Sequence, residues 1–139
     1  DIYVTVNGQQ VEDGKGNNVF DANQGKGILF HNETSTENNW LKIRLEGKVS
    51  NRDGFGALVR VFINKDEYKQ SLISGQGYFS SNAKELYFGL KDANKVDRID
   101  VSWPSGIKQT FQDIPTKQTI YILEGEKMYE NTLTIDKSF

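Results

Sequence analysis

Two polar loops hold the residues of this sequence whose types could do chemistry. The first, residues 50–56, reads Ser-Asn-Arg-Asp-Gly-Phe-Gly, and it offers Asn51 and Asp53 as oxygen donors with Arg52 between them. Oxygen ligands suit Ca²⁺, although two fall well short of the roughly six to eight that this cation takes. The structural alternative is a turn in which the two glycines adopt positive φ and the neighbouring polar side chains form local hydrogen bonds. Turns of this kind are common, which favours the structural interpretation.

The second loop, residues 75–82, reads Gly-Gln-Gly-Tyr-Phe-Ser-Ser-Asn. An exposed Tyr78 flanked by the amides of Gln76 and Asn82 could stack against a sugar ring and hydrogen-bond its hydroxyls. Alternatively, Tyr78 and Phe79 cap the core, and this second interpretation is favoured. The glycine spacing does not match a phosphate loop, because no Lys followed by Ser or Thr comes after it and no helix is predicted there.

No catalytic constellation accompanies these loops. His31 is the only histidine, the sequence has no cysteine, and no serine lies in a nucleophile motif, so a catalytic triad is not predicted. Carboxylate pairs such as Asp97 with Asp100 lie in turns or at solvent-facing positions, without the fixed spacing across a cleft that a glycosidase requires. The sequence therefore predicts a protein that is not an enzyme, and a hydrolase is the weakest functional hypothesis.

The elements that must position both loops are β-strands. Residues 40–46 alternate between apolar and charged side chains, and residues 57–63 are apolar at nearly every position except Arg60. Residues 96–103 also alternate, and they end at Pro104, which cannot donate to a sheet ladder. No stretch has a helical period of adequate length. Short strands recur about every 10–15 residues, which predicts an all-β fold.

We expect an antiparallel β-sandwich or partly closed barrel of about seven strands, with a short N-terminal β-hairpin. The strands of the main body are expected at residues 40–46, 57–63, 68–74, 85–90, 96–103, 108–113 and 118–123. The hairpin is expected from residues 1–8 and 28–31, with a polar loop between them at 9–27. The expected core consists of the inward-facing apolar side chains Leu41, Ile43, Leu45, Val59, Val61, Leu72, Leu86, Phe88, Leu90, Ile99, Val101, Trp103, Phe111, Ile120 and Ile122.

Composition excludes several classes of function. The 139 residues carry a net charge of −2 with both signs interspersed, so they lack the basic patch that nucleic-acid binding requires. No apolar run approaches the roughly 20 residues of a membrane span. The absence of cysteine excludes disulfides and thiolate metal sites but leaves the compartment open. Because the chain begins at Asp1 without a methionine, we expect a fragment or a processed product.

Ordered motifs run along the chain from about residue 39 to residue 123. They are Asn39-Trp40-Leu41, Ser50-Asn51-Arg52-Asp53-Gly54 with Gly56-Ala57, Gly75 with Gly77 and Tyr78, Phe88-Gly89-Leu90, Val96-Asp97-Arg98-Ile99 and Trp103-Pro104-Ser105-Gly106. In order and spacing these motifs resemble the ASPIC/UnbV domain family, which includes cartilage acidic protein. In that family the domain follows FG-GAP (VCBS) repeats, which build β-propellers.

The resemblance implies that the chain is divided into three parts. Residues 1–36 would be the remnant of a terminal FG-GAP/VCBS repeat with a linker, residues 39–123 the β domain, and residues 124–139 a polar C-terminal tail. Asp1-Ile2-Tyr3-Val4 resembles the end of the calcium motif of the repeat. The resemblance thus implies Ca²⁺ in the repeats of the parent protein and no cofactor in this chain. Asp1 and, from the first loop, Asp53 are the candidate metal ligands.

The leading functional hypothesis is a non-catalytic interaction module, used in adhesion or assembly by a larger extracellular or cell-surface protein. It rests on the setting of the family and on the absence of a reactive constellation. The partner would be a protein or a glycan at the cell surface, with no nucleic acid and no membrane insertion. The alternative is a carbohydrate-binding domain, for which the candidate contacts are Tyr78, Gln76, Asn82, Asn51 and Arg52.

Overall fold

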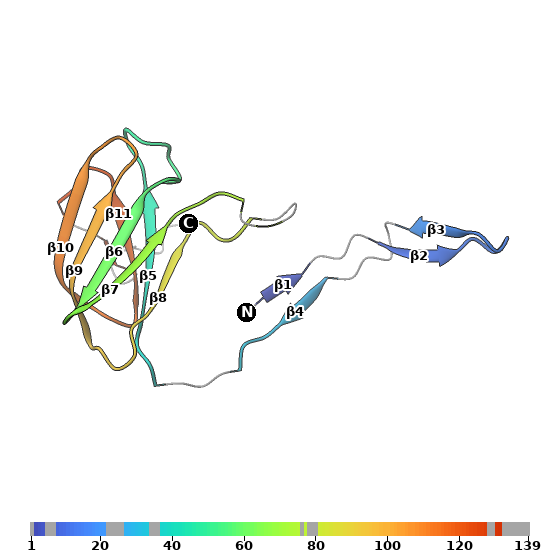
Figure 1. Cartoon of the computed structure of the whole chain (residues 1–139), viewed down its shortest axis with the longest axis horizontal. Helices are drawn as coiled ribbons and strands as arrows, with labels where there is room; N and C mark the ends of the chain where they lie inside the picture. The colour runs from blue at the N-terminus through green and yellow to red at the C-terminus, as the bar shows by residue number, and fades with distance from the viewer. Residues whose placement is uncertain are drawn as a thin grey trace, which may run out of the picture. The chain divides into compact units, whose positions relative to one another are not determined.

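The structure is a computed structural model, and it describes residues 2–4, 8–21, 27–33, 37–75, 77, 81–127 and 130–131. The chain divides into two compact units, Asp1–Thr36 and Glu37–Phe139 (Figure 1). The larger unit carries the candidate functional site.

Two four-stranded sheets make up the described part of the larger unit, in the orders β10-β9-β6-β7 and β12-β11-β5-β8 (Figure 1). Their strands are β5 (Trp40–Glu46), β6 (Leu58–Ile63), β7 (Asp66–Ser71), β8 (Leu86–Gly89), β9 (Lys95–Ser102), β10 (Lys108–Pro115), β11 (Gln118–Leu123) and β12 (Glu130–Asn131). Neither sheet closes into a barrel, and the part of the chain that the structure describes contains no helix. The predicted all-β sandwich is therefore confirmed. A search of the same residues for a helix long and apolar enough to cross a membrane finds none.

One strand pair runs parallel, where the sequence analysis expects antiparallel pairs. β11 lies beside β5, with Gln118 opposite Leu41 and Leu123 opposite Glu46. The preceding strand, β10, belongs to the other sheet, so the chain crosses between the layers instead of returning by a hairpin within one sheet. This crossing sets the direction of β11, and the alternation of side chains along a strand does not reveal direction.

The core lies between the facing sides of the two sheets. Every side chain that the sequence analysis assigns to the core is buried, which confirms that prediction. Each fully buried aliphatic side chain stabilises the fold by about 1.5–3 kcal/mol relative to an exposed one. Further buried side chains lie at or near strand ends, where the alternation is harder to extend: Ala57, Ile63, Val96 and Ile114.

The turn after β9 ends that strand as the sequence predicts. Trp103 is buried, and its backbone N–H donates to the Ile107 carbonyl at 2.9 Å. The Gly106 N–H donates back to the Trp103 carbonyl at 3.0 Å. Gly106 has a φ of 91°, which glycine adopts without a Cβ clash. β10 then begins at Lys108, so both the turn and the following strand are confirmed.

The smaller unit contains an antiparallel pair of very short strands, β1 (Ile2–Val4) and β4 (Ile28–Phe30). Large apolar side chains of this pair are exposed: Ile2 by 65%, Leu29 by 61% and Phe30 by 57%. A two-stranded ribbon is marginally stable on its own in water, so the apolar faces of this pair are unusual for an isolated element.

The smaller unit also contains a hairpin that the sequence analysis misses. β2 (Gln9–Glu12) pairs with β3 (Asn18–Asp21), so the prediction of a polar loop over residues 9–27 is wrong at these strands. The Asp13 carboxylate accepts the backbone N–H groups of Lys15 and Asn17 at 2.8 and 3.1 Å, which closes the turn. Local turn hydrogen bonds mark this hairpin, because the polar sequence of β2 gives no alternating apolar face to detect.

Candidate functional site

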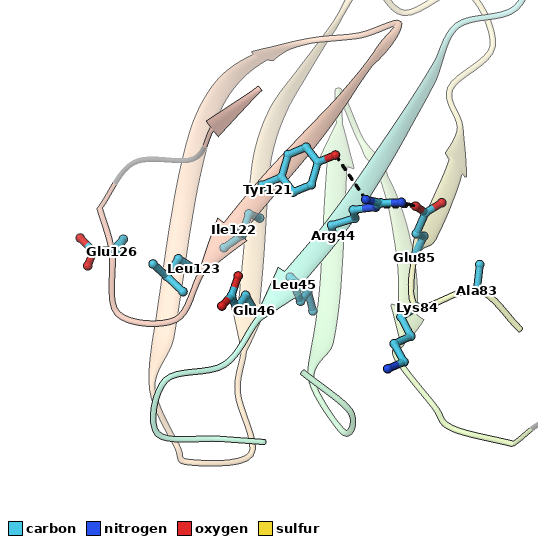
Figure 2. A pocket seen from close by; sticks show the side chains of 10 residues that line it. All are labelled: Arg44, Leu45, Glu46, Ala83, Lys84, Glu85, Tyr121, Ile122, Leu123 and Glu126. Carbon is cyan, nitrogen blue, oxygen red and sulfur yellow. Dashed lines mark hydrogen bonds and ion pairs between the residues drawn. The ribbon is translucent and has the colours of Figure 1, made fainter. Parts of the chain in front are cut away.

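The clearest candidate site is a hollow on the outer face of the sheet that contains β5, β8 and β11 (Figure 2). Its volume is about 710 Å³, within the range of about 300–1,000 Å³ that is typical of sites for small ligands. The lining residues are Arg44, Leu45, Glu46, Ala83, Lys84, Glu85, Tyr121, Ile122, Leu123 and Glu126. None of them is among the site residues that the sequence analysis names.

The alternation of two strands brings the polar wall of the hollow together. Ile43 and Leu45 of β5 point into the core, so Arg44 between them points outward. The parallel register places Tyr121 of β11 directly opposite Arg44. Glu85 comes immediately before β8, which is the other neighbour of β5. The hollow therefore combines side chains that lie far apart in the sequence.

An ordered array, Glu85–Arg44–Tyr121, crosses the hollow (Figure 2). The Arg44 guanidinium donates from Nε to the Glu85 carboxylate and from Nη1 to the Tyr121 hydroxyl, the latter at 3.4 Å. Its Cζ lies 5.5 Å from the centre of the Tyr121 ring. On the other side, Glu85 accepts the Tyr87 hydroxyl and forms an ion pair with Lys42 at 3.2 Å. These contacts fix the directions in which the array presents donors and acceptors.

Glu85 remains ionised in this setting. Partial burial by itself would raise the pKa of Glu85. Hydrogen bonds from Tyr87, Arg44 and Lys42 outweigh burial and hold this pKa below its ordinary value. A carboxyl that is ionised at neutral pH cannot act as a general acid, although it accepts hydrogen bonds well.

The other charges around the hollow are also paired. Lys84 contacts Asp53 at 2.7 Å, and Glu126 contacts Lys48 at 2.5 Å. Glu46 lies 4.0 Å from Arg52, whose side chain is 87% exposed. The wall therefore offers hydrogen-bonding groups and little uncompensated charge.

The loop at residues 50–56 has the geometry of the structural alternative. The Asn51 side chain donates to the Phe55 carbonyl at 2.7 Å and accepts the Phe55 N–H at 2.9 Å. Gly54 and Gly56 have φ values of 70° and 90°. The amide of Asn51 is thus engaged within its own loop, and Asp53 is engaged with Lys84.

The remaining predicted site residues are described only in part. Asn82 is described and exposed, whereas Tyr78, Gln76 and Asp1 lie outside the described residues. No group of three or more potential metal-ligating side chains is present in the part of the chain that the structure describes. The roles of these residues in ligand or metal binding stay predictions.

Glu124 is a buried carboxylate that the sequence analysis places in a polar tail. It is 2% exposed, and its Oε2 accepts the backbone N–H groups of Lys48, Val49 and Ser50, each at 2.7 Å. Its Oε1 accepts the hydroxyls of Ser50 and Ser105, at 2.8 and 2.5 Å. Glu124 therefore ties the end of β11 to two loops from other parts of the sequence.

The hydrogen bonds to Glu124 also set its protonation. Burial favours the neutral form, but the donors from Ser105, Ser50 and Val49 outweigh burial and lower the pKa of Glu124 to about 2. The two carboxylate oxygens of Glu124 already accept five hydrogen bonds from the protein, so the role of Glu124 is structural. In the sequence, only the position of Glu124 directly after an apolar strand indicates this role.

Comparison with known protein families gives one finding that bears on the larger unit. The family described as ASPIC and UnbV matches residues 47–128, more than half of the chain. The chain belongs to the ASPIC and UnbV family. The part that matches the ASPIC and UnbV family holds β6 to β11, the loop at 50–56, Glu124 and most of the lining of the hollow. No curated protein and no solved structure matches the chain.

Proposed function

We propose that this chain is a non-catalytic interaction module of a larger extracellular surface protein, used in adhesion or assembly. The observation that carries the proposal is the open hollow, whose aromatic and charged side chains are held in fixed positions by contacts with one another. Preordered groups on a rigid sheet lose little entropy when a ligand binds, and this favours recognition.

The chemistry of the site supports binding over catalysis. Glu85 stays ionised, and the other carboxylates of the hollow are paired with cations. His31 lies in the smaller unit and is exposed. A hydrolase that uses a pair of carboxyl groups would need a protonated carboxyl beside the bound substrate, and Glu85 does not supply one.

The exposed apolar side chains of β1 and β4 support the placement of the smaller unit in a larger sheet. Ile28 and Phe30 share one face of β4 while Leu29 lies on the other, and all three are exposed. Strands that are apolar on both faces are usually covered on both sides. We therefore propose that β1 and β4 belong to the last FG-GAP/VCBS repeat of a propeller, and that Ca²⁺ binds in such repeats of the parent protein.

A binding assay on intact cells tests the proposed function. The full chain, labelled with a fluorophore, is added to cells of the organism that encodes it, and the bound fraction is measured by flow cytometry. We expect saturable binding that unlabelled chain displaces. Binding that never saturates, or turnover of chromogenic ester or glycoside substrates by the purified chain, would contradict the proposal.

Carbohydrate binding is the second candidate function. The specific observation in its favour is the combination of Tyr121 with the half-exposed Arg44 in one hollow, because aromatic rings and planar polar groups together suit sugars. The cells of the assay can be pretreated with protease or with periodate to separate the two kinds of partner. Loss of binding after protease alone indicates a protein, and loss after periodate alone indicates a glycan.

A further inference from the structure

We propose that the hollow between β5, β8 and β11 binds a short neutral saccharide, with Tyr121 and Leu123 packed against the C–H faces of the sugar and Arg44 donating to adjacent hydroxyls. This inference rests on the proposed function and names the chemical class of its ligand. It differs from the carbohydrate site that the sequence analysis predicts, which is centred on Tyr78.

The first argument concerns the donors and acceptors in the hollow. The Arg44 side chain is 49% exposed although it contacts Glu85 and Tyr121. A guanidinium has about five N–H donors in a planar fork, so some of them remain for a ligand. Adjacent hydroxyls of a sugar ring are spaced to accept from such a fork, and Glu85, whose carboxylate is occupied by Arg44, Tyr87 and Lys42, holds the fork in place.

The second argument concerns charge. Arg44 is paired with Glu85, Lys84 with Asp53 and Glu126 with Lys48. An anionic or cationic ligand would have to displace an existing ion pair before it gained one. A neutral ligand leaves these ion pairs intact and forms additional hydrogen bonds with the side chains that make them. The pairing therefore favours an uncharged, hydroxyl-rich molecule over a uronate, a sulfated glycan or a basic peptide.

The third argument concerns the position of the hollow on a sheet face. β5 is hydrogen-bonded to β11 on one side and to β8 on the other, so the sheet ladders occupy its backbone groups. An extended peptide binds best where a strand edge offers free N–H and C=O groups. The hollow presents side chains instead, and Tyr121 and Leu123 add apolar surface on which a pyranose ring can pack.

Titration calorimetry with the full chain tests the inference at neutral pH. The probes are linear hexasaccharides of glucose, mannose and xylose, a sulfated and a uronic-acid hexasaccharide, and an unstructured neutral peptide. We expect saturable binding of at least one neutral hexasaccharide, with Arg44→Ala and Tyr121→Ala each weakening it by about tenfold, since Arg and Tyr dominate most binding sites.

The outer face of the other sheet offers matched control variants. There Arg98 lies 4.0 Å from the centre of the Phe62 ring, an arginine–aromatic pair like that of Arg44 with Tyr121. We expect Arg98→Ala and Phe62→Ala to leave the affinity within about twofold of the wild type. Arg44→Lys keeps the charge and the fold but removes the planar fork, and we expect it to weaken binding as well.

The outcomes separate this inference from the proposed function. Binding of a neutral hexasaccharide that Arg44→Ala and Tyr121→Ala leave unchanged would show that the hollow is not the site. Binding of only the charged saccharides or the peptide, lost in those variants, would overturn the ligand class while the interaction function stands. Absence of binding by every probe would overturn the inference, and saturable cell binding would then still support a protein partner.

Discussion

Gly54 is a position where a single added methyl group should disturb the larger unit, because a side chain there would approach the core. A Cβ on Gly54 would lie 2.8 Å from the Leu45 Cβ and 3.4 Å from Cζ3 of the buried Trp103. The Gly54 N–H also donates to the Asn51 carbonyl at 2.9 Å, and its carbonyl accepts the Ala57 N–H at 3.0 Å. The loop is therefore held at both sides and cannot move away from Leu45 without loss of hydrogen bonds.

The size of the effect follows from two separate costs. Alanine in the left-handed region costs about 1–2 kcal/mol, and the lower entropy of the unfolded chain offsets about 0.4–1 kcal/mol of that cost. The contact with Leu45 adds about 1–3 kcal/mol for overpacking. Gly75 has the same φ of 70°, and a Cβ there would meet no atom within 4 Å. Gly75→Ala therefore carries only the first cost and isolates the second.

Urea unfolding followed by tryptophan fluorescence measures both variants, because Trp40 and Trp103 both lie in the larger unit. We expect Gly54→Ala to lower the free energy of unfolding by about 1–3 kcal/mol more than Gly75→Ala does. Equal losses in the two variants would refute the reasoning, since they would show that the approach to Leu45 has no energetic consequence.

Two further predictions concern stability. The folded pKa of Glu124, about 2, lies below its ordinary value of 4.5, so its stabilising contribution is complete above pH 4.5 and is lost as the pH falls toward 2. We expect urea titrations to show a lower free energy of unfolding for Glu124→Gln than for the wild type at pH 7, and a difference that narrows as the pH falls from 4.5 toward 2. A difference that does not change with pH would contradict the assigned pKa. Ile99 is fully buried, so Ile99→Ala should cost about 2–5 kcal/mol in the same assay. Val49→Ala, at a side chain that is 74% exposed, should stay within about 0.5 kcal/mol of the wild type, and similar values for the two variants would argue against the assigned core.

Local patterns in the sequence predict the sheets of the larger unit well. The strands at 40–46 and 118–123 begin and end where alternation predicts. The alternation also fixes which face of each strand is buried, because a shift of one residue in the pairing register would turn the apolar side chains toward solvent. Pro104 predicts the end of β9 from the sequence alone, because proline has no backbone N–H to donate to the sheet ladder. The hairpin of β2 and β3 is not predicted, because β2 is polar apart from Val11 and gives no alternating apolar face, and because hydrogen bonds to Asp13 close its turn.

The candidate site could not be predicted in the same way. Arg44 and Tyr121 are visible in the sequence as outward residues of strands, but only the crossing of β11 into the other sheet places them side by side. Glu85 joins them from the start of a third strand. The polar residues of the loop at 50–56 are adjacent in sequence and so suggest a site, but Asn51 forms its hydrogen bonds within its own turn. Contacts across strands carry the information that a single sequence lacks.

The most direct test of the proposed function compares two arginine variants in the cell-binding assay. Arg44 lies in the hollow, while Arg60 is similarly exposed on the other sheet and pairs with Glu67 at 3.7 Å. We predict that Arg44→Ala lowers the affinity for the cell surface by about tenfold while Arg60→Ala changes it by less than about twofold. Affinities that fall equally in both variants, or in neither, would contradict the assignment of the hollow as the interaction site.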